Sequence, residues 1–310
     1  MLIGAVALAL LAVALAWPIP IALPRAAWPV DNPATALVLW QAIALGGGLS
    51  MFGSLLGFGL AGTGANLPHA GADLLAAAFT GPLPSAYGAI QLFLLSAAAL
   101  LALDLLVNLV DTAVRAERER RRHRDLIALL TAPHADRARV RVIEHPAPVA
   151  YCLPGARTVT VLSNGLIELL DADRLRAVLA HEDAHLRQQH HLMLLAFRSW
   201  RRALPWFPIA TRAERSVGLL VELLADDQAV RQADAETLAA AIEQVGSGWE
   251  AAEDATTSAA GRPVASAMAV RIRRLRVNGR PLTWAARFGV LAASVGLVAV
   301  PAGYLVALMI

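Results

Sequence analysis

The stretch AVLAHEDAHLRQQHHLML, residues 177–194, contains two histidines four residues apart, with a glutamate directly after the first. In a helix, His181 and His185 leave the same face one turn apart, so both imidazoles can reach one metal ion. Neutral imidazole is a favoured zinc ligand. Glu182 lies about 100° around the helix, where it can reach the water that a catalytic zinc activates without binding the metal. The spacing therefore predicts the catalytic helix of a zinc peptidase, with Glu182 as the general base.

The residues before this motif help to decide between a metal site and a polar surface helix. Three fixed positions also match by chance in some unrelated chains, so the motif needs support from its surroundings. The preceding segment LRAVLA, residues 175–180, is apolar and helical in pattern, which favours burial of the helix in a domain. The flanks therefore favour the metal site.

A catalytic zinc needs a third protein ligand and an open position. His191 is the first candidate, because some zinc proteases place their third ligand at this spacing. Those proteases have glycine where this chain has Gln188, since their chain must leave the helix and turn back. Here the segment LRQQHHLMLLAFRSW, residues 186–200, keeps its helical character. We therefore expect one continuous helix that directs His191 away from His185.

Glu222 is the second candidate, in the apolar segment VELLADDQAV, residues 221–230. Asp226 follows four residues later on the same helix face, where it could accept a hydrogen bond from the free N–H of a ligating histidine. Asp227 and Glu214 are weaker substitutes for the third ligand. Glu222 is therefore favoured over His191 as the third ligand beside His181 and His185. His190, His191 and the arginines remain open as groups that stabilise the oxyanion.

The composition points to a membrane protein, because 57% of the residues are hydrophobic and only 16% are charged. The excess lies in four apolar runs, each long enough to cross a bilayer. A signal peptide is an alternative for the first run, but that run lacks a basic start and a clear cleavage site. The expected spans cover about 2–23, 34–61 and 89–114, with a fourth span within 282–310. Between the second and third spans we expect an external loop, from about residue 62 to 88.

Residues 115–281 have mixed composition and the size of a domain. Two short β-branched segments, 139–144 and 157–163, read as strands, and the rest is mainly helical in pattern. The segment 157–163, RTVTVLS, is expected as an edge strand that binds an extended peptide. The predicted fold is therefore a multi-pass α-helical membrane protein with four spans. A cytosolic α+β zincin-like metallopeptidase domain is inserted between the third and fourth spans.

Two arginine-rich segments, 115–125 and 271–280, border this insert next to the membrane spans. The positive-inside rule then places the insert in the cytosol and both termini outside. Membrane topology and anionic lipid headgroups explain these arginines, so direct nucleic-acid binding is not expected.

The single cysteine, Cys152, excludes an internal disulfide and a cysteine-based zinc cluster. In the third span, Asp104, Asn108 and Asp111 share a polar stripe. Asn108 and Asp111 are expected at the cytosolic interface, whereas a charge at the depth of Asp104 is costly without a partner.

The motif HEDAH followed by ELLAD, residues 222–226, resembles the gluzincin membrane peptidases. These include the HtpX and CAAX-protease type and the BlaR/MecR type of sensor-transducer. The segments AYCLPG, TVTVLSNGL and RIRRL also resemble the BlaR/MecR peptidases, as does the order of three spans, insert and fourth span. The resemblance implies a bacterial multi-pass protein of the cell membrane with one Zn²⁺ per chain. It further implies that His181, His185 and Glu222 bind the metal and that Glu182 is the general base. Asp226 would accept a hydrogen bond from the free N–H of a ligating histidine.

The resemblance also implies a function in signal transduction. The expected activity is a zinc-dependent endopeptidase that cleaves a cytosolic protein, and a transcriptional repressor of the BlaI/MecI type is one candidate substrate. The chain ends at Ile310, so a penicillin-sensor domain is not expected. One alternative is an HtpX-like protease that removes misfolded membrane proteins. A second alternative is a non-catalytic receptor or scaffold that retains the fold.

Overall fold

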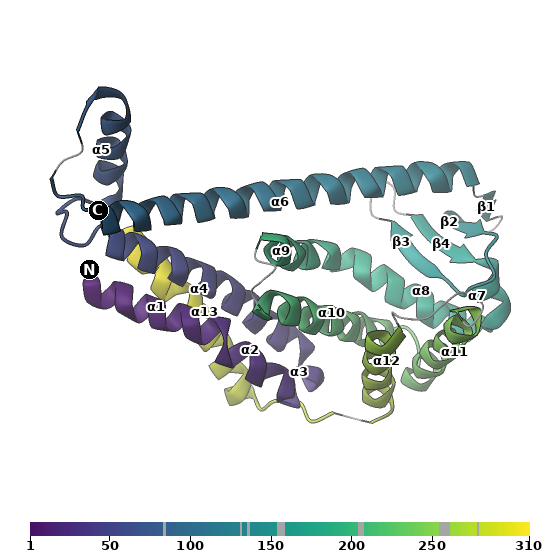
Figure 1. Ribbon diagram of the computed structural model, residues 1–310. Coiled ribbons are helices and arrows are strands. Elements are labelled where there is room, and N and C mark those ends of the chain that lie inside the picture. The colour runs from purple at the N-terminus through teal and green to yellow at the C-terminus, as the bar shows by residue number, and fades with distance from the viewer. Residues whose placement is uncertain are drawn as a thin grey trace.

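The structure is a computed structural model in which a bundle of apolar helices is joined to a mixed domain (Figure 1). It describes residues 1–82, 85–130, 132–134, 137–153, 159–203, 208–253, 261–277 and 279–310. Among the described residues, four helical segments are long and apolar enough to cross a membrane, in agreement with the number of spans expected. The first, Leu2–Arg25, begins with α1 (Leu2–Ala16), and the others lie in α4 (Pro33–Gly59), α6 (Ala89–Leu130) and α13 (Trp284–Ala307).

The first span is interrupted near its end. Pro18 has no backbone N–H, and α1 stops before it. The chain continues through α2 (Pro18–Ala22), the short 3-10 turn η1 (Leu23–Arg25) and α3 (Trp28–Asp31).

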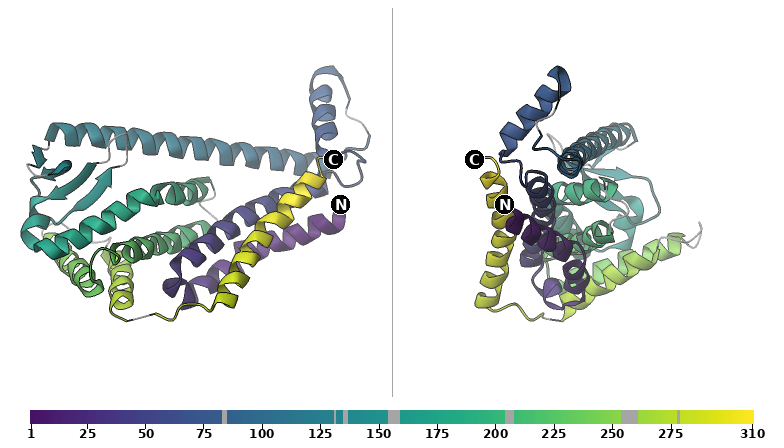
Figure 2. Two further views of the ribbon diagram at one scale, coloured as in Figure 1. Left: turned by 180° about the vertical axis from the view of Figure 1, so that it is seen from behind. Right: turned by 60° about the vertical axis from the view of Figure 1, so that its left-hand side comes forward.

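Glycines allow α4 to pack closely on α1 and α13. A Cβ at Gly46 would collide with the backbone oxygen of Leu297 on α13, and one at Gly57 would collide with the hydroxyl of Tyr304. Close approach of backbones at small residues is the usual way in which membrane helices associate. In Figure 2 both termini lie at the same end of this bundle.

The expected loop between the second and third spans contains a helix, α5 (Leu67–Thr80), so an irregular loop was the wrong prediction there. Asn66 caps this helix, since its side-chain oxygen accepts a hydrogen bond from the N–H of His69 at 3.0 Å. The N–H of Leu67 also donates to the carbonyl of Leu308 at 2.8 Å, which ties the segment to the end of α13.

Helix α6 has 42 residues and runs from the bundle to the sheet without a break (Figure 1). The apolar run ends near Val114, but ion pairs between residues four apart support the helix beyond it. One example joins Arg121 and Glu117 at 2.8 Å. Within the third candidate span, the Asn108 side-chain amide donates a hydrogen bond to the Asp104 carboxylate at 3.0 Å. Asp104 therefore has a polar partner one turn away on the same helix.

The sheet has four described strands in the order β1-β2-β4-β3. Strand β2 pairs with β4 in parallel, while β1 and β3 are antiparallel to their neighbours. The expected edge strand within 157–163 is therefore wrong, because β4 lies inside the sheet and the edge strands of the described residues are β1 and β3. The strands are β1 (Ala132–His134), β2 (Arg137–Ile143), β3 (Ala150–Leu153) and β4 (Val159–Ser163).

Six helices complete the domain: α7 (Asn164–Leu169), α8 (Ala172–Arg187), α9 (His190–Ala203), α10 (Pro208–Ala229), α11 (Ala235–Glu253) and α12 (Gly261–Arg276). Helices α9 and α10 run beside α6 and α4, so they dock the domain on the bundle (Figures 1 and 2). Phe197 and Val217 of this pair share one buried core with Trp40 and Ile43 of α4. The spans and the domain therefore pack as one body at this junction.

The continuous helix expected through residues 186–200 is wrong. Helix α8 ends at Arg187 and α9 begins at His190, with Gln189 at φ +48° between them. A non-glycine residue rarely adopts this left-handed conformation, and a glutamine in the sequence does not predict it.

Candidate metal centre

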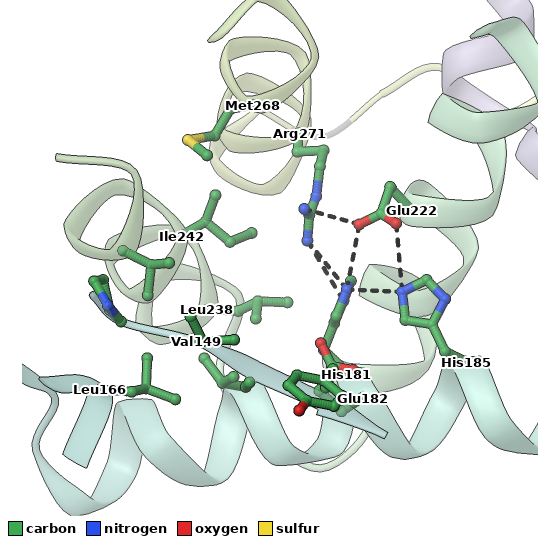
Figure 3. Close-up of a pocket in the computed structure, with 15 residues that line it drawn as sticks. Val149, Leu166, His181, Glu182, His185, Glu222, Leu238, Ile242, Met268 and Arg271 are labelled. Carbon is green, nitrogen blue, oxygen red and sulfur yellow. Dashed lines mark hydrogen bonds and ion pairs between the residues drawn. The ribbon is translucent and has the colours of Figure 1, made fainter. Parts of the chain in front are cut away.

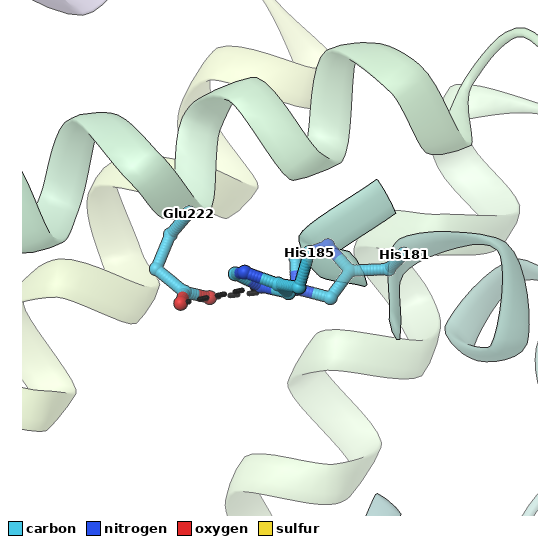
Figure 4. A group of neighbouring side chains, drawn as sticks. All are labelled: His181, His185 and Glu222. Atoms are coloured by element: carbon cyan, nitrogen blue, oxygen red, sulfur yellow. Dashed lines mark hydrogen bonds and ion pairs between the residues drawn. The ribbon is translucent and has the colours of Figure 1, made fainter. Parts of the chain in front are cut away.

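Helix α8 presents the two histidines of the motif towards α10. Asp171 caps the start of α8, accepting a hydrogen bond from the N–H of Arg174 at 2.9 Å. The buried residues Ala177 and Ala184 keep side chains small on the packed face of α8. His181 and His185 therefore face Glu222 across the space between α8 and α10 (Figure 4).

The distances within this trio fit a metal ion. The Nε2 atoms of His181 and His185 are 3.1 Å apart. The Glu222 carboxylate lies 3.4 Å from the first and 3.5 Å from the second. Two ligand atoms at zinc-ligand distance from a tetrahedral ion are separated by roughly 3.3 Å. The two Glu222 distances are to different oxygens of the carboxylate, and one ligand atom from each of the three residues lies within 4.8 Å of the others. Two imidazole nitrogens and a carboxylate are the ligands of many catalytic zinc sites, so the residues fit the metal that the sequence predicts.

Each histidine is held on its other ring nitrogen. Nδ1 of His181 lies 2.9 Å from Asp226, which is fully buried. Nδ1 of His185 lies 2.9 Å from Nδ1 of His190, and the other nitrogen of His190 lies 2.7 Å from the Gln188 side chain. A partner on one nitrogen fixes the ring and directs the other nitrogen to the metal.

His190 is a residue whose position sequence reasoning missed, since it was considered only for the oxyanion. It reaches His185 because the chain breaks at Gln188 and Gln189, and the break was not foreseen. His191 lies in α9, but its side chain is outside the described part of the chain. The alternative ligands have other partners: Asp227 pairs with Arg274 at 2.6 Å and Glu214 with Arg201 at 2.5 Å.

Arg271 of α12 also enters the site (Figure 3). Its Nε and Nη2 donate to the two Asp226 oxygens at 2.8 and 2.7 Å, and its Nη1 lies 3.0 Å from Glu222. The two parallel contacts with Asp226 form a bidentate guanidinium–carboxylate pair. Sequence reasoning placed Arg271 in a membrane-flanking cluster, although it lies in the RIRRL segment that resembles the peptidases.

The charges of the site explain its pKa values. Burial by itself raises the pKa of Asp226, but hydrogen bonds from Arg271 and His181 outweigh it and hold the pKa at about 2. For Glu222, burial is likewise outweighed by His181 and Arg271, and the pKa is about 2. Both groups are therefore carboxylates at neutral pH, as a metal ligand and a hydrogen-bond acceptor must be.

The two histidines shift in opposite directions. Burial lowers the pKa of His181, yet hydrogen bonds with Asp226 and Glu222 outweigh it and raise the pKa to about 9. Burial dominates at His185 and lowers its pKa to about 4, so this imidazole is neutral at pH 7. The carboxylates that favour a positive charge on His181 also favour a metal cation at the same place.

The trio lies at one end of a cavity of about 380 Å³. Glu182 lines this cavity beside the histidines (Figure 3). Tyr151 of the edge strand β3 also lines it, and the Tyr151 hydroxyl lies 2.9 Å from Nε2 of His123 on α6. The opposite end of the cavity is apolar and includes Leu166, Val178, Leu238, Ile242 and Met268.

Comparison with known proteins agrees with this geometry. Residues 113–244 match the model of peptidase family M48, and the matched part contains both histidines and Glu222. No curated protein and no solved structure matches the chain significantly. Members of this family are metallopeptidases that usually use zinc, and here the matched part adjoins helices able to cross a membrane. Residues 113–244 are thus similar to peptidase family M48, and together with the apolar helices they give the chain the features of a membrane metalloprotease.

Proposed function

We propose that the protein is an integral-membrane zinc endopeptidase whose active site is the cavity between β3, α8 and α10. The observation that carries the proposal is the set of separations among His181, His185 and Glu222. The two Nε2 atoms are 3.1 Å apart, one Glu222 oxygen lies 3.4 Å from His181 and the other lies 3.5 Å from His185, so the three side chains converge on one point that a metal ion could occupy. We propose one Zn²⁺ per chain at this place, held by these three side chains.

The roles of the protein groups follow from their positions. Bound zinc would supply Lewis acidity that polarises a peptide carbonyl and acidifies water. Glu182 takes a proton from the attacking water, whose oxygen forms a bond to the carbonyl carbon. The C–N bond then breaks, and Glu182 delivers the proton to the leaving amine nitrogen. Asp226, held by Arg271, fixes the ring of His181, and His190 fixes the ring of His185.

The cavity suits an extended peptide. Strand β3 is an edge strand of the described sheet, and Ala150 and Tyr151 of this strand line the cavity. An edge strand offers unpaired backbone groups to which a peptide can add as a further strand. The apolar end, with Leu238, Ile242 and Met268, would receive an apolar side chain next to the cleaved bond.

Glu182→Gln is the most direct test of the enzyme. It keeps the size of the side chain and removes the base, so zinc content should stay at one per chain. Peptide cleavage should fall by about 10³-fold, within the usual range for a lost general base. Undiminished cleavage by this variant would refute the role of Glu182. A wild-type protein that cleaves nothing and binds no zinc would favour the non-catalytic receptor or scaffold.

Metal analysis tests the ligand set. Glu222→Ala should lose zinc, whereas His191→Ala, one residue into α9, should retain it. Loss of zinc only in the His191 variant would move the third ligand to His191 and refute the assignment of Glu222.

We further propose that the domain faces the cytosol, with both termini outside, and that the substrate is a cytosolic protein. The arginine-rich segments 115–125 and 271–280 support this orientation by the positive-inside rule. A transcriptional repressor of the BlaI/MecI type is the substrate that the resemblance favours, which would place the protein in signal transduction. Membrane proteins handled by an HtpX-like quality-control protease are the alternative. Identification of proteins trapped by Glu182→Gln in cells distinguishes a soluble repressor from membrane proteins.

A further inference from the structure

A second hollow lies where the domain meets the bundle. It is a groove of about 580 Å³ between α4, α6 and α9. Its walls include Leu49 and Phe52 of α4, Leu105 and Leu109 of α6, and Met193 and Trp200 of α9. Among the described residues that line it, none is charged, and Gln41 and Ser199 add the only amide and hydroxyl. The groove therefore suits a hydrocarbon ligand.

The position of the groove along α6 places it beside lipid. Both α4 and α6 are candidate membrane spans. Leu109 lies six residues and Leu105 ten residues before Arg115, the first arginine of its cluster. At 1.5 Å per residue these positions are about 9 and 15 Å from that arginine along the helix. On α6 the groove thus lies within the depth of one leaflet, whose hydrocarbon is about 15 Å thick.

A cation lies beside the groove. Arg202, near the end of α9, donates to the hydroxyl of Thr112 at 3.4 Å. Thr112 lies on α6 between Leu109 and Arg115, on the side of the groove nearer the arginines. Arg198 and Arg201 of the same helix pair with Glu214. In the part of the chain that the structure describes, Arg202 has no carboxylate within ion-pair distance. This guanidinium is therefore available to a phosphate.

We propose that the groove binds one acyl chain of a membrane phospholipid, with the anionic headgroup at Arg202. The volume lies within the range of about 300–1,000 Å³ of small-molecule sites. A peptide segment fits less well, because its backbone N–H and C=O groups would find few hydrogen-bond partners on these apolar walls. Arg202 reaches Thr112, which lies three residues after the groove residue Leu109 on α6, so an anionic headgroup can meet this guanidinium while its acyl chain lies in the groove.

Photo-crosslinking on the full-length protein tests the acyl chain. The probe is phosphatidylglycerol that carries a photoreactive group on its acyl chain, incorporated into lipid nanodiscs. Adducts should concentrate on the groove faces of α4, α6 and α9. Gly48→Leu fills the groove from α4, where a Cβ meets nothing within 4 Å. Adducts on these faces should then fall by on the order of tenfold, equivalent to about 1.4 kcal/mol.

Gly289→Leu on α13 is the matched control, because a Cβ there also meets nothing within 4 Å and Gly289 does not line the groove. It should leave the adducts unchanged. Equal adducts in both variants, or adducts spread evenly over α1 and α13, would show only ordinary surrounding lipid and overturn the proposal. Adducts displaced by an apolar peptide, but not by unlabelled phosphatidylglycerol, would make the groove a peptide site and also overturn it.

The headgroup is tested by comparing phosphatidylglycerol with phosphatidylcholine probes. The wild type should prefer the anionic probe, and Arg202→Gln should remove that preference. Arg231→Gln, an exposed arginine after α10, is the control and should retain it. No preference in the wild type, or an unchanged preference in Arg202→Gln, would overturn the headgroup assignment.

Discussion

Two arginine-rich segments border the peptidase domain, and they have opposite environments. In α6, Arg115 and Arg121 are mostly exposed, at 62% and 71% of their side chains, and pair with carboxylates one turn away. In α12, the Arg271 side chain is only 14% exposed and contacts two carboxylates of the candidate metal centre. Composition and position next to a span gave both segments the same interpretation. Only the packing of α12 against α10 separates a membrane-flanking arginine from one inside the site.

This difference has an energetic meaning. An exposed ion pair contributes little, because water screens the charges and the side chains lose entropy when they pair. Removal of one partner of a buried pair is much more costly, because the remaining charge is left without its counter-ion. The two segments should therefore respond very differently to the same substitution.

Arg271→Ala should have the largest effect. It leaves Asp226 and Glu222 without their guanidinium, and we expect unfolding free energy to fall by about 3 kcal/mol. Denaturation of the full chain in detergent measures this, and peptide cleavage should fall with it. Arg271→Lys keeps the charge but cannot form the bidentate pair, so it should give an intermediate loss. Wild-type stability in Arg271→Ala would contradict the buried role.

Asp226→Asn tests whether this residue links Arg271 to the metal ligand. An amide keeps the size of the side chain but loses the charge that orients His181. Zinc affinity should fall by about 10- to 100-fold, as for other partners of ligating histidines. The matched change Asp227→Asn should alter it little, since Asp227 pairs with Arg274 instead. Equal losses in both variants would indicate a general effect of charge.

The pH dependence of stability should separate wild type from Arg271→Ala. The pKa of Asp226 in the folded protein is about 2, below its ordinary value, because of Arg271 and His181. A lowered carboxylate pKa adds stability that is complete above about pH 4 and is lost as pH falls through about 2. Without Arg271 the folded pKa rises, so the advantage of the wild type should shrink as pH falls below about 4. Thermal midpoints of both proteins over this range measure it, and a constant difference would argue against the pair.

Arg121→Ala should have the smallest effect. Its ion pair with Glu117 is exposed, so the expected change in unfolding free energy is below about 0.5 kcal/mol. The same denaturation assay provides the comparison with Arg271→Ala. A loss as large as that of Arg271→Ala would remove the distinction between the two segments.

Much of the candidate site could be predicted from local spacing. Helix periodicity places His181 and His185 on one face, and the resemblance singled out Glu222 and Asp226, which the structure brings together with them. His190 could not be predicted in its place, because it depends on a left-handed Gln189 between two helices. The edge strand could not be predicted either, since β-branched residues suit a central strand and an edge strand equally.

The four apolar helices and the spacing of the histidine motif can be predicted from the amino-acid sequence alone. Both depend on residues close together in the chain, where hydrophobic length and helical period act directly. The tertiary structure alone decided that β3 forms an edge of the sheet, that His190 supports His185, and that Arg271 enters the site. Arg271 lies 45 residues from Asp226 in the chain. Contacts of this kind depend on how whole helices pack, and no local pattern of residues encodes that packing.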